Sequence, residues 1–204
     1  MSQNKTMSTQ KLTRIAILAA LAAILFLFPE IPTPIPFYKI DLSNLPVLLG
    51  AFSMGPGAGV LILFIKSLTG MLHTSSAYVG ELADFASGLA MVLPAALIYR
   101  GKKTRAGALV GMLVGTVAAS LVGVVMNYYV LIPFFISSSP YITLEAVVEA
   151  GAKLLPMVDT LWKFVLVITL PFNLIKFGLI SLLTFLIYKP LSPLLHARHA
   201  REAA

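Results

Sequence analysis

Long apolar runs are the feature of this sequence that most restricts its fold. A helix needs about 20 apolar residues to cross a bilayer, and such runs occupy residues 12–28, 79–99, 106–135 and 161–188. The chain is 58% hydrophobic and 11% charged, whereas soluble domains are about 25% charged. A soluble fold of 204 residues has too little core to bury so much apolar surface. The sequence therefore predicts one all-α integral membrane domain over residues 1–204.

The stretch that begins at residue 45 can be interpreted as one span, 45–65, or as two helices, because Gly55-Pro56-Gly57 interrupts it with strong turn-forming residues. As one span it gives five spans in all and leaves the basic residues of 100–105 outside. As two helices, 45–54 and 58–72, it gives six. Cytoplasmic loops are rich in Lys and Arg, so we favour six transmembrane helices with both termini cytoplasmic. Ten of the 15 basic residues then lie inside: Lys5, Lys11, Arg14, Arg100, Lys102, Lys103, Arg105, Lys189, Arg198 and Arg201.

The first run also has the charge pattern of a cleaved signal peptide, since Lys5, Lys11 and Arg14 precede the apolar residues 15–28. A retained first span is the simpler interpretation. The run leads directly into a loop with four prolines between residues 29 and 36 and then into further apolar segments.

Polar side chains inside spans are costly and are therefore candidates for function. In the six-span arrangement they gather in the outer half of the membrane, which predicts an outward-facing ligand pocket rather than an ion relay through the full thickness. The candidates are Tyr38, Lys39, Asp41, Asn44, Lys66, Glu81, Asn127, Asn173 and Lys176. Simpler roles exist: the lysines could snorkel to the interface, and Asn127 could bridge two helices. Asp84 is equally well explained as an acid at a helix start.

Two stripes of small residues allow helices to approach closely. The stripe of the fifth span has a spacing of four, from Gly107 to Gly123, and internal packing is the favoured interpretation. In the first span Ala16 pairs with Ala20 and Ala19 with Ala23. These alanines could pack internally or contact another protein.

Catalytic motifs are missing from the sequence. It contains neither H-E-x-x-H nor G-x-S-x-G, and no phosphate-binding G-x-x-x-x-G-K-[ST] loop. No second His or Cys lies near His73 at the spacing of metal ligands, so no metal site is expected. The sequence therefore predicts a protein that is not an enzyme, and any active transport would need a separate motor.

Five short motifs resemble a known family. Residues 37–46 (FYKIDLSNLP) and 51–59 (AFSMGPGAG) are similar to the substrate-binding (S) subunits of energy-coupling-factor (ECF) vitamin transporters. Residues 79–85 (VGELADF), 126–129 (MNYY) and 171–176 (PFNLIK) resemble the riboflavin-specific members.

This resemblance implies a multi-pass protein of a bacterial cell membrane, with a vitamin pocket and no ATPase of its own. It implies a transmembrane T subunit and two cytoplasmic ATPase subunits as partners, and no nucleic acid. The pocket residues that it carries over are Glu81, Asn127, Asn173 and Lys176, with the loop after the first span as a lid. It also implies that Ala16, Ala19, Ala20 and Ala23 dock on the T subunit.

Riboflavin suits the candidate residues chemically. Its ring system has amide-like edges that Asn127 and Asn173 could pair with, and its neutral hydroxyl chain could bond Glu81 and Lys176. A phosphorylated ligand would favour arginine, and all five arginines lie inside in the six-span arrangement. Riboflavin is expected as a transported ligand and no cofactor is expected. The alternatives are an S subunit for another vitamin, a stand-alone secondary transporter or a membrane-embedded enzyme.

Overall fold

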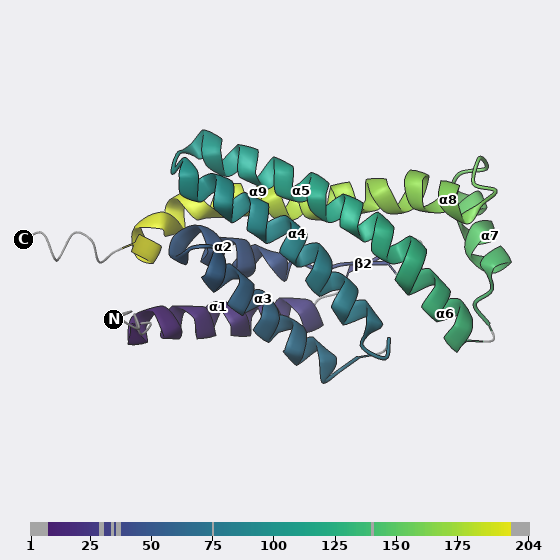
Figure 1. Ribbon diagram of the computed structural model, residues 1–204, viewed down its shortest axis with the longest axis horizontal. Coiled ribbons are helices and arrows are strands. Elements are labelled where there is room, and N and C mark those ends of the chain that lie inside the picture. The colour runs from purple at the N-terminus through teal and green to yellow at the C-terminus, as the bar shows by residue number, and fades with distance from the viewer. Residues whose placement is uncertain are drawn as a thin grey trace, which may run out of the picture.

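The computed structural model describes residues 8–28, 31–33, 35, 38–74, 76–139 and 141–196, and it is almost entirely helical (Figure 1). The elements in chain order are α1 (Thr9–Leu27), β1 (Ile31–Pro32), β2 (Lys39–Ile40), α2 (Asn44–Met54), α3 (Pro56–Met71), α4 (Val79–Gly101), α5 (Arg105–Met126), the π-helix η1 (Asn127–Leu131), α6 (Ile132–Ser138), α7 (Leu144–Leu154), α8 (Leu161–Phe164), the π-helix η2 (Val165–Thr169) and α9 (Leu170–His196).

Four helices are long and apolar enough to cross a membrane: α1, α4, the continuous helix Arg105–Ser138, and Leu161–Tyr188. The prediction of an all-α membrane protein is confirmed. Large apolar side chains cover the outside of these helices, as Leu113, Val117 and Leu121 of α5 show, each more than half exposed. Such a surface is stable against lipid tails and costly in water.

The disputed stretch forms two helices, as predicted, with the turn at Gly55. Its φ of 97° lies in the region that glycine adopts without strain. Pro56 then begins α3, where its missing N–H costs nothing. The first of the two helices, α2, has 11 residues and is therefore about 16 Å long, about half of a hydrocarbon core of about 30 Å.

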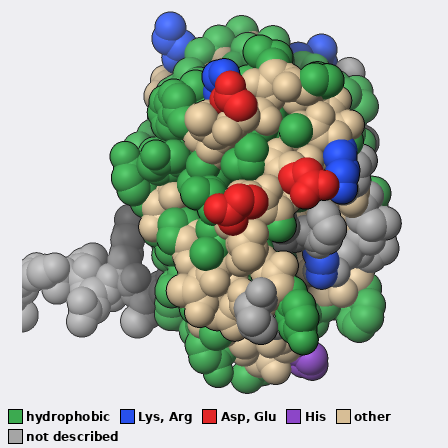
Figure 2. Space-filling view, turned by 90° about the vertical axis from the view of Figure 1, so that its right-hand side faces the viewer, with side chains coloured by type: hydrophobic (Ala, Val, Ile, Leu, Met, Phe, Trp, Pro, Cys, Tyr) green, Lys and Arg blue, Asp and Glu red, His purple; other side chains and the backbone are tan. Residues whose placement is uncertain are grey.

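The connections of the helices separate into two ends of the molecule. The beginning of α1, the turn between α2 and α3, the connection from α4 to α5 and the last turns of α9 lie at one end, which we call the terminal end (Figure 1). At the opposite end, the α7 end, lie α6, α7 and α8, and acidic side chains are visible there (Figure 2). Basic side chains are visible on this face as well, and the basic residues of the α4–α5 connection lie at the opposite end of the molecule.

The glycine stripe of α5 packs inside the chain, as favoured from the sequence. A Cβ atom at Gly115 would lie 2.3 Å from the carbonyl oxygen of Met91 in α4, and one at Gly111 would lie 2.7 Å from that of Ala95. Only glycine fits so close to a neighbouring backbone.

The two π-helices occupy equivalent positions in their helices. Each has five residues and ends two residues before a proline, η1 before Pro133 and η2 before Pro171. A proline ring within a helix clashes with the carbonyl four residues earlier, and each of these carbonyls lies within a π segment. The wider turn accommodates the ring without ending the helix.

Two features differ from the expected spans. The polar stretch after residue 137 contains α7, whose Gly151 lies against Phe164 and Val158. In addition, α9 continues to His196, beyond the expected end of the last span at residue 188.

Candidate ligand-binding site

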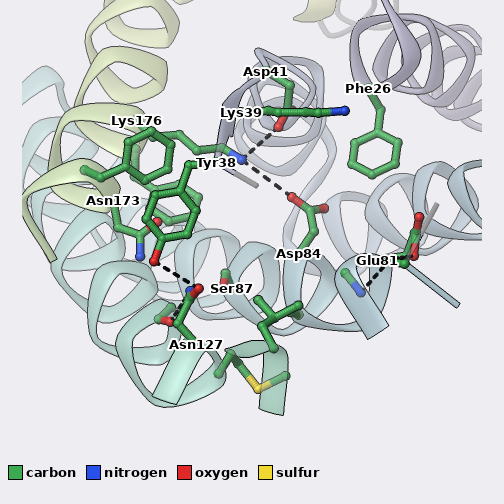
Figure 3. A pocket seen from close by; sticks show the side chains of 18 of the residues that line it. Phe26, Tyr38, Lys39, Asp41, Glu81, Asp84, Ser87, Asn127, Asn173 and Lys176 are labelled. Carbon is green, nitrogen blue, oxygen red and sulfur yellow. Dashed lines mark hydrogen bonds and ion pairs between the residues drawn. The ribbon is translucent and has the colours of Figure 1, made fainter. Parts of the chain in front are cut away.

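A cavity of about 420 Å³ lies toward the α7 end, within the size range of small-molecule sites (Figure 3). Its wall combines Phe26 from the end of α1, the loop before α2, the first turns of α4, the junction of α5 with η1, and the first turns of α9. It therefore lies above α2, in the volume that a full-length second span would have occupied. The short α2 is what makes room for the cavity.

Tyr38 fixes the loop before α2 in the cavity wall. Its ring stacks on Phe172 of α9 at 4.8 Å between centroids and an interplanar angle of 14°. Its hydroxyl donates to Asn127 Oδ1 at 3.1 Å and also bonds the hydroxyl of Thr169 (Figure 3). Tyr38 thus joins the loop to both π-helices, since Asn127 begins η1 and Thr169 ends η2.

The two asparagines of the cavity differ in their hydrogen bonding. Asn127 accepts from Tyr38, and its Nδ2 donates to the carbonyl oxygen of Gly123 at 2.8 Å. Asn173 is also buried, but its Nδ2 has no hydrogen-bond partner among the described residues. A buried donor without a partner costs about 1–3 kcal/mol. Asn173 Nδ2 is packed against Gly123, and the side chain of Asn173 lines the cavity without a bond that commits its amide nitrogen, whereas Asn127 is partly committed to holding the wall.

Gly123 explains why Asn173 can occupy its position. A Cβ atom at Gly123 would lie 2.3 Å from Asn173 Nδ2, so any other residue there would displace the amide. The last residue of the small-residue stripe of α5 therefore shapes the cavity, in addition to the packing role of the earlier ones.

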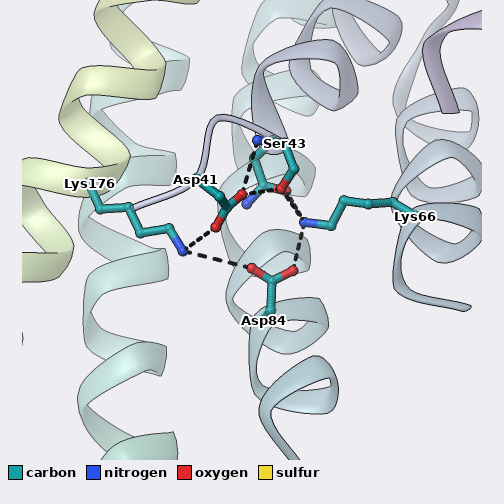
Figure 4. Close-up of polar contacts among 6 residues, drawn as sticks. Asp41, Ser43, Lys66, Asp84 and Lys176 are labelled. Carbon is teal, nitrogen blue, oxygen red and sulfur yellow. Dashed lines mark hydrogen bonds and ion pairs between the residues drawn. The ribbon is translucent and has the colours of Figure 1, made fainter. Parts of the chain in front are cut away.

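Four charged side chains form a closed ring beside the cavity (Figure 4). Lys176 Nζ lies 2.8 Å from Asp41 Oδ2 and 4.0 Å from Asp84 Oδ1. Lys66 Nζ lies 2.6 Å from Asp84 Oδ2 and donates to Ser43 Oγ at 2.8 Å, and Ser43 in turn donates to Asp41. The ring joins α3, α4, α9 and the loop before α2, and its formal charge is zero.

Glu81 lines another part of the cavity, close to the start of α4. Its Oε2 accepts from Thr74 Oγ1 and from Ser76 Oγ, both at 2.9 Å. These bonds hold the loop between α3 and α4 against the cavity, where Ser76 also lines the wall.

The structure brings most of the predicted pocket residues together. The cavity wall includes Tyr38, Lys39, Asp41, Glu81, Asn127, Asn173 and Lys176. Two predicted residues, Asn44 and Lys66, do not line it. They are fully buried behind it, where Asn44 Oδ1 accepts from Lys66 Nζ at 3.1 Å. Lys66 therefore does not snorkel to an interface, because its charge is neutralised inside the protein.

Sequence reasoning missed part of the wall. Asp84 lines the cavity and completes the charge ring, although its position also suited a simple helix-start acid. Ser87, one turn later on α4, lines it too. The aromatic part of the wall was also missed: Phe26, Phe135, Phe172 and Phe177. An apolar residue in an apolar helix gives no signal that it faces a cavity.

The four alanines proposed to dock on a partner lie on two faces of α1. Ala19 and Ala23 are buried inside the chain, with relative exposures of 1% and 8%. Ala16 and Ala20 are exposed. Of the four alanines, only Ala16 and Ala20 are therefore accessible to a partner helix.

Comparison with known proteins supports the resemblance of the motifs. The family described as ECF transporter, substrate-specific component, matches residues 10–188. A solved structure described as "Structure and mechanism of the S component of a bacterial ECF transporter" superimposes with a TM-score of 0.70 and 28% identity, covering 91% of this chain and 97% of that one.

Individual relatives match over almost their whole lengths. The riboflavin transporter RibU of Staphylococcus aureus (strain TCH60) is 28% identical over 196 residues, which cover 94% of this chain and 97% of the relative. The riboflavin transporter FmnP of Bacillus subtilis (strain 168) is 28% identical, with 92% and 94% covered. RibU of Lactococcus lactis subsp. cremoris (strain NZ9000) is 30% identical, with 88% and 91% covered.

These matches establish the class of the protein. The family consists of transport subunits and not of enzymes, which confirms the prediction from the missing catalytic motifs. Its relatives are bacterial, and the long apolar helices confirm the prediction of a multi-pass membrane protein. With 179 consecutive positions matched and the same fold, the chain belongs to the family of substrate-specific components of ECF transporters.

Proposed function

We propose that this protein binds riboflavin in the cavity of about 420 Å³ and mediates its uptake as the S component of an ECF transporter. The observation that carries the proposal is the cavity wall, which combines the side-chain amides of Asn127 and Asn173 with aromatic rings. The amide-like edge of a flat ring could pair with such amides. The relatives described above are named riboflavin transporters, which supports this ligand.

The composition of the wall fits the two parts of riboflavin. Phe26, Phe172 and Phe177 offer apolar contact to the ring system, since aromatic rings stack on flat ligands. The hydroxyl chain can bond carboxylates and hydroxyls such as Asp84 and Ser87. Arginine is absent from the described wall, which disfavours a ligand with a phosphate.

The proposed topology follows from the two ends of the molecule. The terminal end would face the cytoplasm, because the basic α4–α5 connection and the ends of α1 and α9 lie there. The chain would then be one membrane domain of six embedded helices, with α2 crossing only the inner half, and the cavity would open outward. A separate T subunit would contact α1 through Ala16 and Ala20, and two cytoplasmic ATPases would supply the energy.

Flavin titration of the purified protein tests the ligand. The fluorescence of riboflavin should be quenched when it binds, and biotin and thiamine should not compete with it for the site. Asn173→Ala should weaken riboflavin binding about 5- to 150-fold, because it removes a hydrogen bond worth about 1–3 kcal/mol. The control is Ser181→Ala, on the same helix but bonded to Thr116 and outside the cavity; its affinity should stay within about twofold.

Two results would contradict the proposal. Riboflavin affinity that is unchanged in Asn173→Ala would remove this residue from the site, and preferential binding of another vitamin would change the ligand. Uptake of riboflavin by proteoliposomes that contain this chain alone, driven by an ion gradient, would favour a stand-alone secondary transporter.

A further inference from the structure

A second cavity, of about 330 Å³, lies at the terminal end, opposite the ligand cavity. It is formed where the α4–α5 connection meets α9 at residues 185–188. The connection contributes Lys103, Thr104 and Arg105, and the two long helices contribute Tyr99 and Tyr188. Neither riboflavin binding nor contact through α1 uses these residues.

The charge at this cavity is positive and not neutralised within the described chain. Neither Lys103 nor Arg105 forms an ion pair with any of the described residues, and both are exposed. The sequence has no acid between Asp84 and Glu145, and both of these lie toward the α7 end. The cavity therefore has a positive charge that a bound anion would neutralise.

The start of α5 adds to this positive potential. Thr104 caps the helix by accepting from Gly107 N at 3.0 Å, and the first intrahelical bond runs from Ala108 N to Thr104 O. The N–H groups of Arg105 and Ala106 precede that bond and so have no partner within the helix. They point out of a 22-residue helix whose dipole favours an anion at this end.

The remaining wall is aromatic and apolar. The hydroxyls of Tyr99 and Tyr188 lie 3.0 Å apart, and both rings pack on Phe52, with centroids 4.9 and 5.6 Å away. This packing makes the wall rigid. Leu186, which also lines the cavity, is 59% exposed on the outside of α9. The cavity is therefore cationic at the helix ends and opens onto the lipid-facing surface.

We propose that this cavity binds the phosphate of an anionic phospholipid. The phosphate would lie between Lys103 and Arg105 at the start of α5, and an acyl chain would follow Leu186 along α9. Lysine and arginine clusters at the membrane surface attract anionic lipids, and arginine suits phosphate because it can donate two parallel hydrogen bonds. The apolar opening distinguishes a lipid from a free phosphate, which would gain nothing from it.

The test measures binding of dioctanoyl phosphatidylglycerol to the purified, delipidated full-length protein. Dioctanoyl phosphatidylcholine has the same chains without net charge and should bind at least tenfold more weakly. Lys103→Gln with Arg105→Gln should weaken phosphatidylglycerol binding about 10- to 30-fold, since each surface cation contributes about a fivefold factor. The matched control is Arg100→Gln with Lys102→Gln, which removes two charges from the same region but none from the cavity wall. Its affinity should stay within about twofold.

Three outcomes would overturn the proposal. Equal losses in the two double variants would show a diffuse basic surface without a built site. Competition by inorganic phosphate or glycerol phosphate at the concentration of the lipid would assign the cavity to a free phosphate compound. Equal affinity for the two lipids would show that the net negative charge of the headgroup is not recognised, since both lipids share the phosphodiester and the chains. Thermal unfolding of each variant checks that its fold is unchanged, and all four replaced side chains are exposed.

Discussion

Lys66 is among the largest side chains that are completely buried in the described part of the chain, and it carries a charge. Its ammonium group is neutralised by Asp84 and hydrogen-bonded by Ser43 and Asn44. Burying a charge is costly unless it is paired and hydrogen-bonded. The charge ring therefore has two effects: it makes Lys66 tolerable, and it ties the loop before α2 to three helices.

Removing one charged member of the ring should destabilise the protein more than removing an oppositely charged pair. Lys66→Met leaves the two aspartates with only Lys176 and should reduce the free energy of unfolding by about 3–5 kcal/mol. Lys66→Met with Asp84→Asn leaves a neutral pair and should recover more than half of that loss. Thermal unfolding in detergent, without flavin, measures both.

The control for this comparison is Lys163→Met. Lys163 pairs with Asp159 at an exposed site, and exposed pairs are worth about 0–1 kcal/mol. A double variant of Lys66 and Asp84 that lost the sum of the two single losses would show that the residues act independently.

The sequence predicted where along the helices the polar residues lie but not the direction in which they face. Polar residues within apolar helices had to be neutralised or functional, and the structure has Asn173 and Lys176 in the cavity wall. The same reasoning could not separate Lys66, which is buried behind the cavity wall, from Asp84, which lines the cavity. That distinction depends on the rotation of each helix, and therefore on packing between residues far apart in sequence.

Helix α1 has two faces that differ in burial. Ala19 and Ala23 are buried against the chain, and Ala16 and Ala20 are exposed. Helices in lipid associate through close contact, so a smooth exposed strip favours a partner helix. A small-residue pattern shows that close approach is possible, but it does not show which helix approaches.

Leucine substitutions should separate the two faces. Ala16→Leu with Ala20→Leu should preserve thermal stability and flavin affinity but abolish co-purification with the T subunit, because leucine would hold the helices apart. Ala19→Leu with Ala23→Leu should instead lower stability, since overpacking a core typically costs about 1–3 kcal/mol per site. Full association of the first variant with the T subunit would remove α1 from the interface.

The π-helices show a limit of prediction at the scale of elements. Pro133 and Pro171 are evident in the sequence, and a proline in a helix signals a kink or a break. Both helices nevertheless continue, because each widens by one π segment. Whether a helix ends, kinks or widens at a proline depends on the contacts around it, and here Tyr38 bonds a residue of each π-helix.

The arrangement of apolar runs and basic loops predicted most of the overall architecture. Lipid requires that backbone groups be bonded within helices, so each apolar run could only become one. The short length of α2 was harder to predict from the sequence. The prolines within residues 29–44 indicate only that this stretch does not continue a helix. That this loop would descend beside the cavity and contribute Tyr38 and Asp41 depends on long-range contacts.

Cysteine labelling tests the orientation of the whole molecule. The chain has no cysteine, so a single introduced thiol reports without background. Gly57 is exposed and has open space around its Cβ position, and Ser138 is exposed at the α7 end. A membrane-impermeant maleimide added to intact cells should label Ser138→Cys and not Gly57→Cys. The reverse pattern would invert the topology.

The balance of charge at the ligand cavity has a consequence for the driving force of transport. Three lysines (39, 66 and 176) and three acids (Asp41, Glu81 and Asp84) line or support the cavity, so their formal charges cancel. Riboflavin is neutral and leaves that sum at zero. Moving one net charge across an electric potential of 100 mV changes the free energy by about 2.3 kcal/mol. A loaded cavity that shifts relative to the bilayer should therefore experience almost no net electrical force, and uptake should proceed equally well in energised and depolarised cells that contain the same ATP.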